Sequence, residues 1–182
     1  NNSRVADIGG IEKALQQAFP DWSVRRAFTA QIIINHIQAR DQEKIDNMDQ
    51  ALERAVKNGV KELVVQPTHL MHGAEYDELV SAVDKYKDKF DKIALGKPLL
   101  TSDEDFKQVI AAITNDTKEY LDGETAICFM GHGTEADSNK VYATLQEKLK
   151  AAGYNDYFVG TVEAKPSVDD LIAQVKESGK YK

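Results

Sequence analysis

Short apolar runs alternate with segments of helical periodicity along this 182-residue chain, and this alternation limits the folds that the chain can adopt. Runs typical of buried strands are expected at 22–28, 63–65, 92–95, 126–130 and 157–162. Helices are expected between them, at 5–19, from Thr29 onward, and at 46–58, 75–90, 103–120, 139–152 and 167–178. The alternation predicts an α/β protein with parallel sheets and helices on both faces. Right-handed crossovers then bring the carboxyl ends of the strands to one edge.

Gly96, Pro98 and Ser102 cluster near the middle of the chain and predict a division there. We expect two doubly wound parallel-sheet domains, at 1–100 and 101–182, with a cleft between them. The chain opens in a loop-like stretch at Asn1 and closes at Lys182, where a strand would be due. We therefore expect a first strand before Asn1, and a last strand and helix after Lys182, outside this sequence.

Composition narrows the function classes. The net charge of −7 argues against nucleic acid as the main partner, because phosphate binding needs clustered Lys and Arg. No run approaches the roughly 18 apolar residues that a membrane helix needs, and no signal peptide is visible, so we expect a cytoplasmic protein. The single cysteine, Cys128, lies within an apolar strand and is expected to be buried. The sequence leaves open whether the chain forms a homo-oligomer.

The segment from Ile127 to Thr134 carries the first candidate for chemistry. Its apolar run ends in Gly131-His132-Gly133, so a buried strand is expected to deliver His132 to the edge of a sheet. The two glycines would allow a sharp turn and leave room for a large ligand above the imidazole. Ligands of open α/β sheets bind beyond the carboxyl ends of the strands. His132 is thus a candidate metal ligand or general base, with a packing histidine as the alternative.

Two further places carry candidate residues. Glu163 follows the next strand directly, so His132 and Glu163 are a plausible ligand pair for a borderline divalent cation, although a surface carboxylate is the simpler interpretation. The loop from Thr68 to Glu75 contains His69 and His72 before the carboxylate, without the spacing of the zinc-protease helix motif. Glu75 is expected in the first turn of a helix, where a carboxylate is favoured in any case.

Other motifs are missing. The sequence has no G-x-G-x-x-G, no P-loop and no G-x-S-x-G nucleophile elbow, which removes support for dinucleotide, NTPase and serine-hydrolase functions. Cys128 lies within a strand and is a poor candidate nucleophile. His36 lies on a helix face with Ile32 and Ile33 and is expected to be structural.

The chain resembles the anaerobic, CbiK-type sirohydrochlorin cobaltochelatases, which are relatives of the class II chelatases that include ferrochelatase. Together its motifs are specific and follow one another in order over essentially the whole chain. They are Ile11–Leu15 with Ala18-Phe19-Pro20, Val24–Thr29, Val65-Gln66-Pro67 leading to His72–Tyr76, Met130–Gly133, and Gly160–Glu163.

The resemblance implies insertion of Co²⁺ into sirohydrochlorin for cobalamin biosynthesis without ATP, and no cofactor beyond the substrate metal, for which Fe²⁺ or Ni²⁺ would also suit. It implies two similar α/β domains with the active site in the cleft between them. It also implies that His132 and Glu163 bind the metal and that Glu75 helps to remove pyrrole protons. The family's second metal histidine would lie beyond Lys182. Basic residues should meet the substrate's carboxylates, with Lys97, Arg25 and Arg26 as candidates. The alternatives are a non-catalytic tetrapyrrole or metal-binding protein and a metal-dependent hydrolase.

Overall fold

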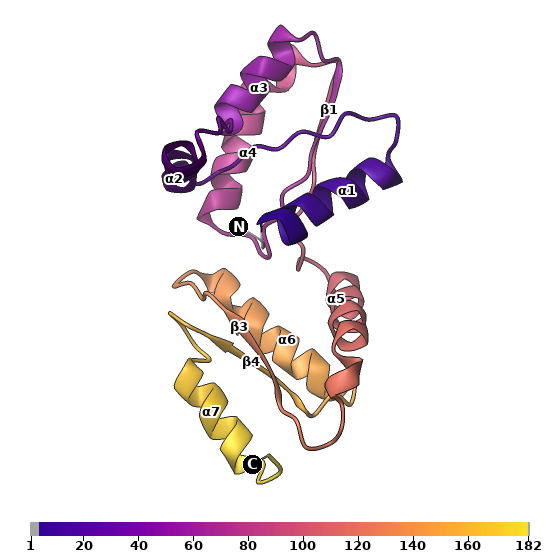
Figure 1. Cartoon of the computed structure of the whole chain (residues 1–182), viewed down its shortest axis with the longest axis vertical. Helices are drawn as coiled ribbons and strands as arrows, with labels where there is room; N and C mark the ends of the chain where they lie inside the picture. The colour runs from indigo at the N-terminus through magenta and orange to yellow at the C-terminus, as the bar shows by residue number, and fades with distance from the viewer. Residues whose placement is uncertain (1–3, 182) are drawn as a thin grey trace. The chain divides into compact units, whose positions relative to one another are not determined.

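The structure, a computed structural model, describes residues 4–181 (Figure 1). In these residues the chain forms seven α-helices and two parallel sheets of two strands each, which confirms the predicted α/β class. The expectations for the chain start at 1–3 and the chain end at Lys182 lie outside the described residues. The chain divides into two compact units, of which unit 1 comprises Asn1–Val65 with Glu78–Leu95 and unit 2 comprises Gln66–Asp77 with Gly96–Lys182. The boundary predicted near residue 100 stays a prediction.

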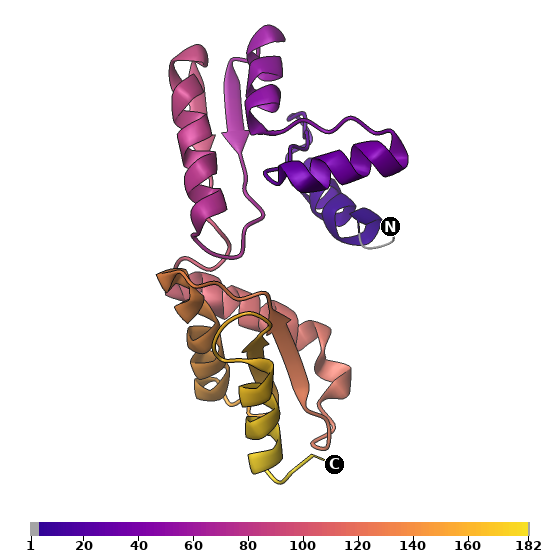
Figure 2. The same ribbon diagram turned by 90° about the vertical axis from the view of Figure 1, so that its left-hand side faces the viewer.

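Unit 1 contains a sheet of β1 (Glu62–Val65) and β2 (Lys92–Leu95), which pair in parallel with Leu63 opposite Ile93. Both of these side chains pack into a core with Leu52 and Phe90, and Figure 2 shows α3 and α4 running beside β1. Val64 points to the opposite face of the sheet and is 53% exposed. The helices are α1 (Gly9–Ala18) after a π-helical turn (η1, Arg4–Ile8), α2 (Gln31–Asp41), α3 (Met48–Lys57), and α4 (Ala74–Tyr86), which continues in a 3₁₀ turn (η2, Lys87–Lys89).

Unit 2 contains a second sheet, in which β3 (Ile127–Gly131) and β4 (Tyr157–Thr161) pair in parallel and in register. The helices are α5 (Asp103–Asp116) with a 3₁₀ turn (η3, Lys118–Tyr120), α6 (Lys140–Ala151) after a 3₁₀ turn (η4, Asp137–Asn139), and α7 (Val168–Glu177).

The two faces of β4 are covered by different helices. Tyr157 and Val159 point into a core that contains Leu149 of α6. The next residue, Gly160, faces α7, where an added Cβ would lie 2.8 Å from Leu171 Cδ1. Since successive residues of a strand point to opposite faces, α6 and α7 pack on opposite sides of the strand (Figure 1). The helices thus wind on both faces of this sheet, as the alternation predicts.

Several helix ends follow the local signals in the sequence. Ser102 and Ser167 form capping boxes with Asp105 and Asp170, each serine accepting a bond from the backbone three residues later. Gly59 follows Asn58, the C-cap of α3, and adopts φ +70°, which is the left-handed conformation that glycine supplies at helix ends.

The strand predicted at 22–28 is wrong. Only Phe28 makes a ladder contact, an isolated parallel bridge to Asn47. The backbone of this segment instead finds a partner in the side chain of Gln16 on α1, which donates to Trp22 O at 2.8 Å and accepts from Val24 N at 3.4 Å. A side chain therefore satisfies polar groups that a neighbouring strand would otherwise pair with.

The helix expected from Thr29 onward forms, but its buried face differs from the prediction. Ala30 occupies the N-cap position, without a side-chain bond. The buried residues of α2 are Ile34 and Ile37, whereas Ile32 is 73% exposed. The expectation of a face carrying Ile32, Ile33 and His36 is therefore wrong, and His36 is exposed.

Cys128 is exposed, so the expectation of a buried cysteine is also wrong. Residues along β3 alternate, with Ile127 and Phe129 packing into the core and Cys128 and Met130 on the other face. Because α7 packs against β4, that face of β3 stays largely open. Partial desolvation of the sulfur still raises the pKa of the Cys128 thiol, which disfavours the nucleophilic thiolate.

Candidate metal centre

The carboxyl ends of β3 and β4 bring two candidate residues together. Gly131 lies opposite Thr161 at the end of the paired strands. The pairing continues past them, because Val162 N donates to Gly131 O at 3.0 Å and Glu163 N donates to His132 O at 2.9 Å. His132 and Glu163 therefore leave the sheet side by side, on backbone that the two strands hold in register.

The side chains of His132 and Glu163 face each other. His132 Nε2 lies 3.1 Å from Glu163 Oε2, and the two side chains are 78% and 64% exposed. Two ligand atoms that each lie about 2.1 Å from one ion, at an angle of about 90–110°, are about 3.0–3.4 Å apart. The pair thus has the separation that two ligands of one cation require, and it is open to solvent. An imidazole nitrogen and a carboxylate oxygen suit a borderline divalent metal.

Gly131 and Gly133, on either side of His132, allow the His132 turn to pack closely against neighbouring residues. A Cβ at Gly131 would lie 2.1 Å from Cε1 of the Tyr142 ring. Gly133 has φ +88°, and a Cβ there would lie 2.8 Å from Ala164 Cβ. Both positions thus face the protein itself, and the expectation that they leave room for a ligand above the imidazole is wrong. They let the His132 turn lie directly against α6 and against the turn that carries Glu163.

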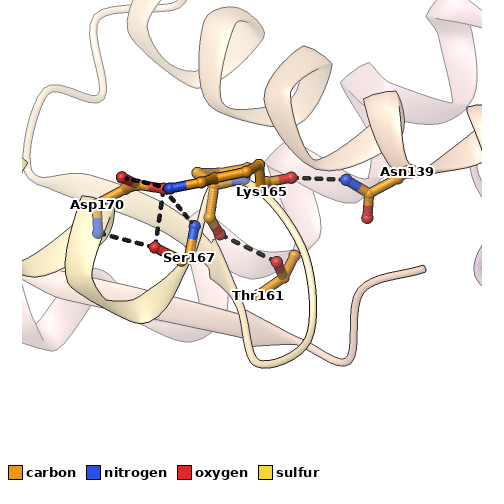
Figure 3. Close-up of polar contacts among 6 residues, drawn as sticks. Asn139, Thr161, Lys165, Ser167 and Asp170 are labelled. Atoms are coloured by element: carbon orange, nitrogen blue, oxygen red, sulfur yellow. Dashed lines mark hydrogen bonds and ion pairs between the residues drawn. The ribbon is translucent and has the colours of Figure 1, made fainter. Parts of the chain in front are cut away.

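The turn after β4 is held by its own polar contacts (Figure 3). The buried Thr161 donates from N and Oγ1 to Pro166 O, at 2.6 and 3.0 Å. Lys165 Nζ lies 3.0 and 2.8 Å from the two carboxylate oxygens of Asp170. Bonds from Lys165, from the Ser167 backbone and from the Ser167 hydroxyl lower the pKa of Asp170 to about 2. Hydrogen bonds therefore hold the backbone before Glu163, at Thr161, and after it, at Pro166 and Ser167.

The loop with His69 and His72 has a different organisation. His72 Nε2 lies 2.7 Å from Asp77 Oδ1, five residues away, and the ring of Tyr76 packs edge-on against His72. His69 Nδ1 is buried without a hydrogen-bond partner in the described part of the chain. Glu75 is exposed in the first turn of α4, as the sequence predicts.

Within residues 4–181, the side chains of the candidate site residues do not all contact one another. Within them, no hydrogen bond or ion pair joins Glu75 to His132 or Glu163, and no group of three or more His, Cys, Asp and Glu side chains is placed to hold a metal ion. The described chain thus supplies two adjacent donors.

The basic candidates differ in their availability. Arg26 is paired with Glu12, its Nε lying 2.7 Å from Glu12 Oε1, and this contact raises the pKa of the guanidinium. Arg25 and Lys97 are exposed.

Between residues 4 and 181 the structure contains no helix that is both long and apolar enough to cross a membrane.

Asn139 also contributes to this site, although no motif in the sequence indicates it. Its side chain contacts the turn after His132 and the turn after Glu163, at Thr134 N and Lys165 O. An asparagine just before a helix is ordinarily interpreted as a cap, so its position in the sequence gave no signal of this role.

The amino-acid sequence is similar to those of known cobalt chelatases. The sequence model of the family described as "Cobalt chelatase (CbiK)" matches residues 1–182. A sirohydrochlorin cobaltochelatase of Salmonella typhimurium is 32% identical over 173 residues, which cover 95% of this chain and 65% of the relative. The sirohydrochlorin cobaltochelatase CbiKC of Nitratidesulfovibrio vulgaris is 26% identical over 171 residues, covering 93% of this chain and 60% of the relative. The chain thus spans less than two thirds of the length of either relative.

Proposed function

This chain belongs to the cobalt chelatase (CbiK) family, and we propose that its protein inserts Co²⁺ into sirohydrochlorin without ATP, in cobalamin biosynthesis. The observation that carries the proposal is the pair of donors at the carboxyl ends of β3 and β4, with His132 Nε2 3.1 Å from Glu163 Oε2. The names of both relatives describe the same activity. The match to the family does not favour the alternatives of a non-catalytic carrier or a metal-dependent hydrolase.

His132 and Glu163 are proposed to bind the incoming metal. Insertion requires that the cation be held and then released to the macrocycle, so a small set of N and O donors is better suited than thiolates, which bind such ions more tightly. The high exposure of both side chains supports this role, because the ion can enter and leave from the open side. Co²⁺ is the proposed metal, and Fe²⁺ or Ni²⁺ differ little from it in their preference for such donors.

Glu75 is proposed to accept a pyrrole proton. Two protons must leave the macrocycle as the metal enters, so an ionised carboxylate or a neutral imidazole near the ring is needed. The exposure of Glu75 at the start of α4 leaves its carboxylate accessible to a substrate. Its role stays a proposal, as do the cytoplasmic location and the domain division at 1–100 and 101–182.

The test is metal-insertion spectroscopy on the full-length protein with free sirohydrochlorin and Co²⁺. We expect His132→Ala to lower the insertion rate at least about 100-fold, since it removes one of two donors and a proton acceptor. His36→Ala is the matched control, because His36 is exposed on α2 and outside the proposed site. Wild-type turnover by His132→Ala would contradict the assignment, and binding without turnover by the wild-type protein would favour a carrier.

A further inference from the structure

Asn139 occupies the N-cap position of α6 but does not cap the helix. Its side chain makes no capping hydrogen bond to the first turn of α6. Its amide oxygen instead accepts from Thr134 N at 3.0 Å. Its amide nitrogen donates to Lys165 O at 2.6 Å, as Figure 3 shows. A backbone N–H can only donate and a backbone carbonyl can only accept, so both ends of the side-chain amide are used.

The two partners of Asn139 occupy equivalent places in the site. Thr134 is the second residue after His132, and Lys165 is the second residue after Glu163. One side chain therefore joins the two turns that carry the proposed metal ligands, just beyond each ligand.

The strands fix the same two turns from the other side. Val162 N and Glu163 N donate to the carbonyls of Gly131 and His132, at 3.0 and 2.9 Å. The Asn139 contacts thus close a ring of bonds around the ligand pair, with the strand ladder on one side and the amide on the other. Breaking the amide bridge leaves the two turns joined mainly through the ladder.

We propose that Asn139 is a positioning residue, which holds the His132 turn against the Glu163 turn and so sets the separation of the two side chains. Only the purpose that we assign to this separation, joint binding of Co²⁺, rests on the proposed function. The bridge itself is a property of the described chain.

The chemistry of the amide separates this role from helix capping. Aspartate and serine cap helices about as well as asparagine. Asn139→Asp keeps a side-chain oxygen that can accept from Thr134 N. It replaces the amide nitrogen, which now donates to Lys165 O at 2.6 Å, by a carboxylate oxygen that cannot donate and repels that carbonyl. A capping role therefore predicts no effect of Asn139→Asp, whereas a positioning role predicts loosening of the Glu163 turn.

The first measurement is hydrogen exchange of individual amides in the full-length protein, and it needs no metal. We expect the amides of Val162 and Glu163 to exchange about fivefold to tenfold faster in Asn139→Asp, because one net hydrogen bond that holds their turn is lost. Asn115→Asp on the exposed side of α5 is the matched control, since it makes the same change of charge away from the site. Wild-type exchange at both amides would overturn the inference, whether or not the protein binds Co²⁺.

The second measurement is a double-mutant cycle on Co²⁺ affinity by calorimetry. We expect Asn139→Asp to weaken Co²⁺ binding about tenfold, which is typical of residues that orient metal ligands. In a Glu163→Ala background the same change should have little further effect, because the ligand that it positions is gone. An equal loss in both backgrounds would contradict positioning of Glu163. A wild-type protein that binds no Co²⁺ would contradict the proposed function, and amide exchange would still decide the bridge.

Discussion

In residues 4–181 the structure contains two exposed pairs of a histidine and a carboxylate, and they are built in different ways. His132 and Glu163 lie on the ends of two paired strands, with 3.1 Å between Nε2 and Oε2. His72 and Asp77 lie on one loop and the helix that follows it, with 2.7 Å between Nε2 and Oδ1. The exposed fractions of the four side chains are similar, from 63% to 78%.

The difference lies in what holds the backbone. The His132 turn packs so closely on Tyr142 and Ala164 that a Cβ at either flanking glycine would overlap them. At Gly73, beside His72, an added Cβ would meet nothing within 4 Å. A dense cluster of ligand-type residues in the sequence therefore marks the more loosely packed of the two places. The constrained pair comes from residues that are distant in sequence and adjacent in the sheet.

The largest expected effect is on stability, and it tests the packing of the two turns. Gly131→Ala should lower the free energy of unfolding by about 3 kcal/mol, at the upper end for overpacking, because the new Cβ would lie 2.1 Å from the Tyr142 ring. Gly73→Ala should change it by less than about 0.5 kcal/mol. Urea unfolding of both variants measures this difference, and equal stabilities would remove the distinction between the turns.

The next effect concerns metal binding. Glu163→Ala should weaken Co²⁺ binding at least about tenfold, since losing a ligand costs no less than losing a group that orients one. Asp77→Ala should leave the Co²⁺ affinity within about twofold, because we assign no metal role to the His72–Asp77 pair. Calorimetry gives both affinities. An unchanged isotherm for Glu163→Ala would remove that residue from the site.

A smaller effect concerns the pH dependence of the turn after β4. The folded-state pKa of Asp170 is lowered to about 2, against about 3.9 in an unfolded chain. The ionised carboxylate is thus favoured by folding, so its stabilisation is present above about pH 4 and is lost as the pH falls toward 2. The difference in Tm between wild type and Asp170→Asn should therefore shrink between pH 4 and pH 2. Thermal unfolding followed by circular dichroism measures it, and a constant difference would contradict the stated role of Asp170.

The smallest effect is expected at the local pair. Asp77→Asn should change the free energy of unfolding by less than about 1 kcal/mol, because an exposed contact between a histidine and a carboxylate and a carboxylate in the first turn of a helix each contribute little. Urea unfolding at low and high salt checks this prediction. A large loss of stability would mean that the loop is as strongly held as the His132 turn.

Local patterns predicted much of the fold and part of the candidate site. The apolar run before Gly131 and the run before Glu163 identified both strands of unit 2, and hence the two residues at their ends. The helices expected at 103–120 and 167–178 also form, and each begins at a serine capping box. Each of these features depends on residues that are close in sequence.

The errors arose where a contact with another element of the fold decides the outcome. The 22–28 segment has an apolar alternation, but Gln16 of α1 binds its backbone in place of a strand. Cys128 lies in an apolar run, but it faces the side of β3 that α7 leaves open, since α7 packs on β4. Periodicity gives the faces of an element and does not say which face will be covered.

The sequence by itself determined the α/β class and the delivery of His132 and Glu163 to strand ends, because strand and helix periodicities are local properties of the chain. Only the tertiary structure decided that the two side chains meet at 3.1 Å, that the glycines serve packing beneath the turn, and that Asn139 bridges the two turns. The reason is physical: these features depend on the register of β3 against β4 and on the packing of α6, which join residues that no local pattern connects.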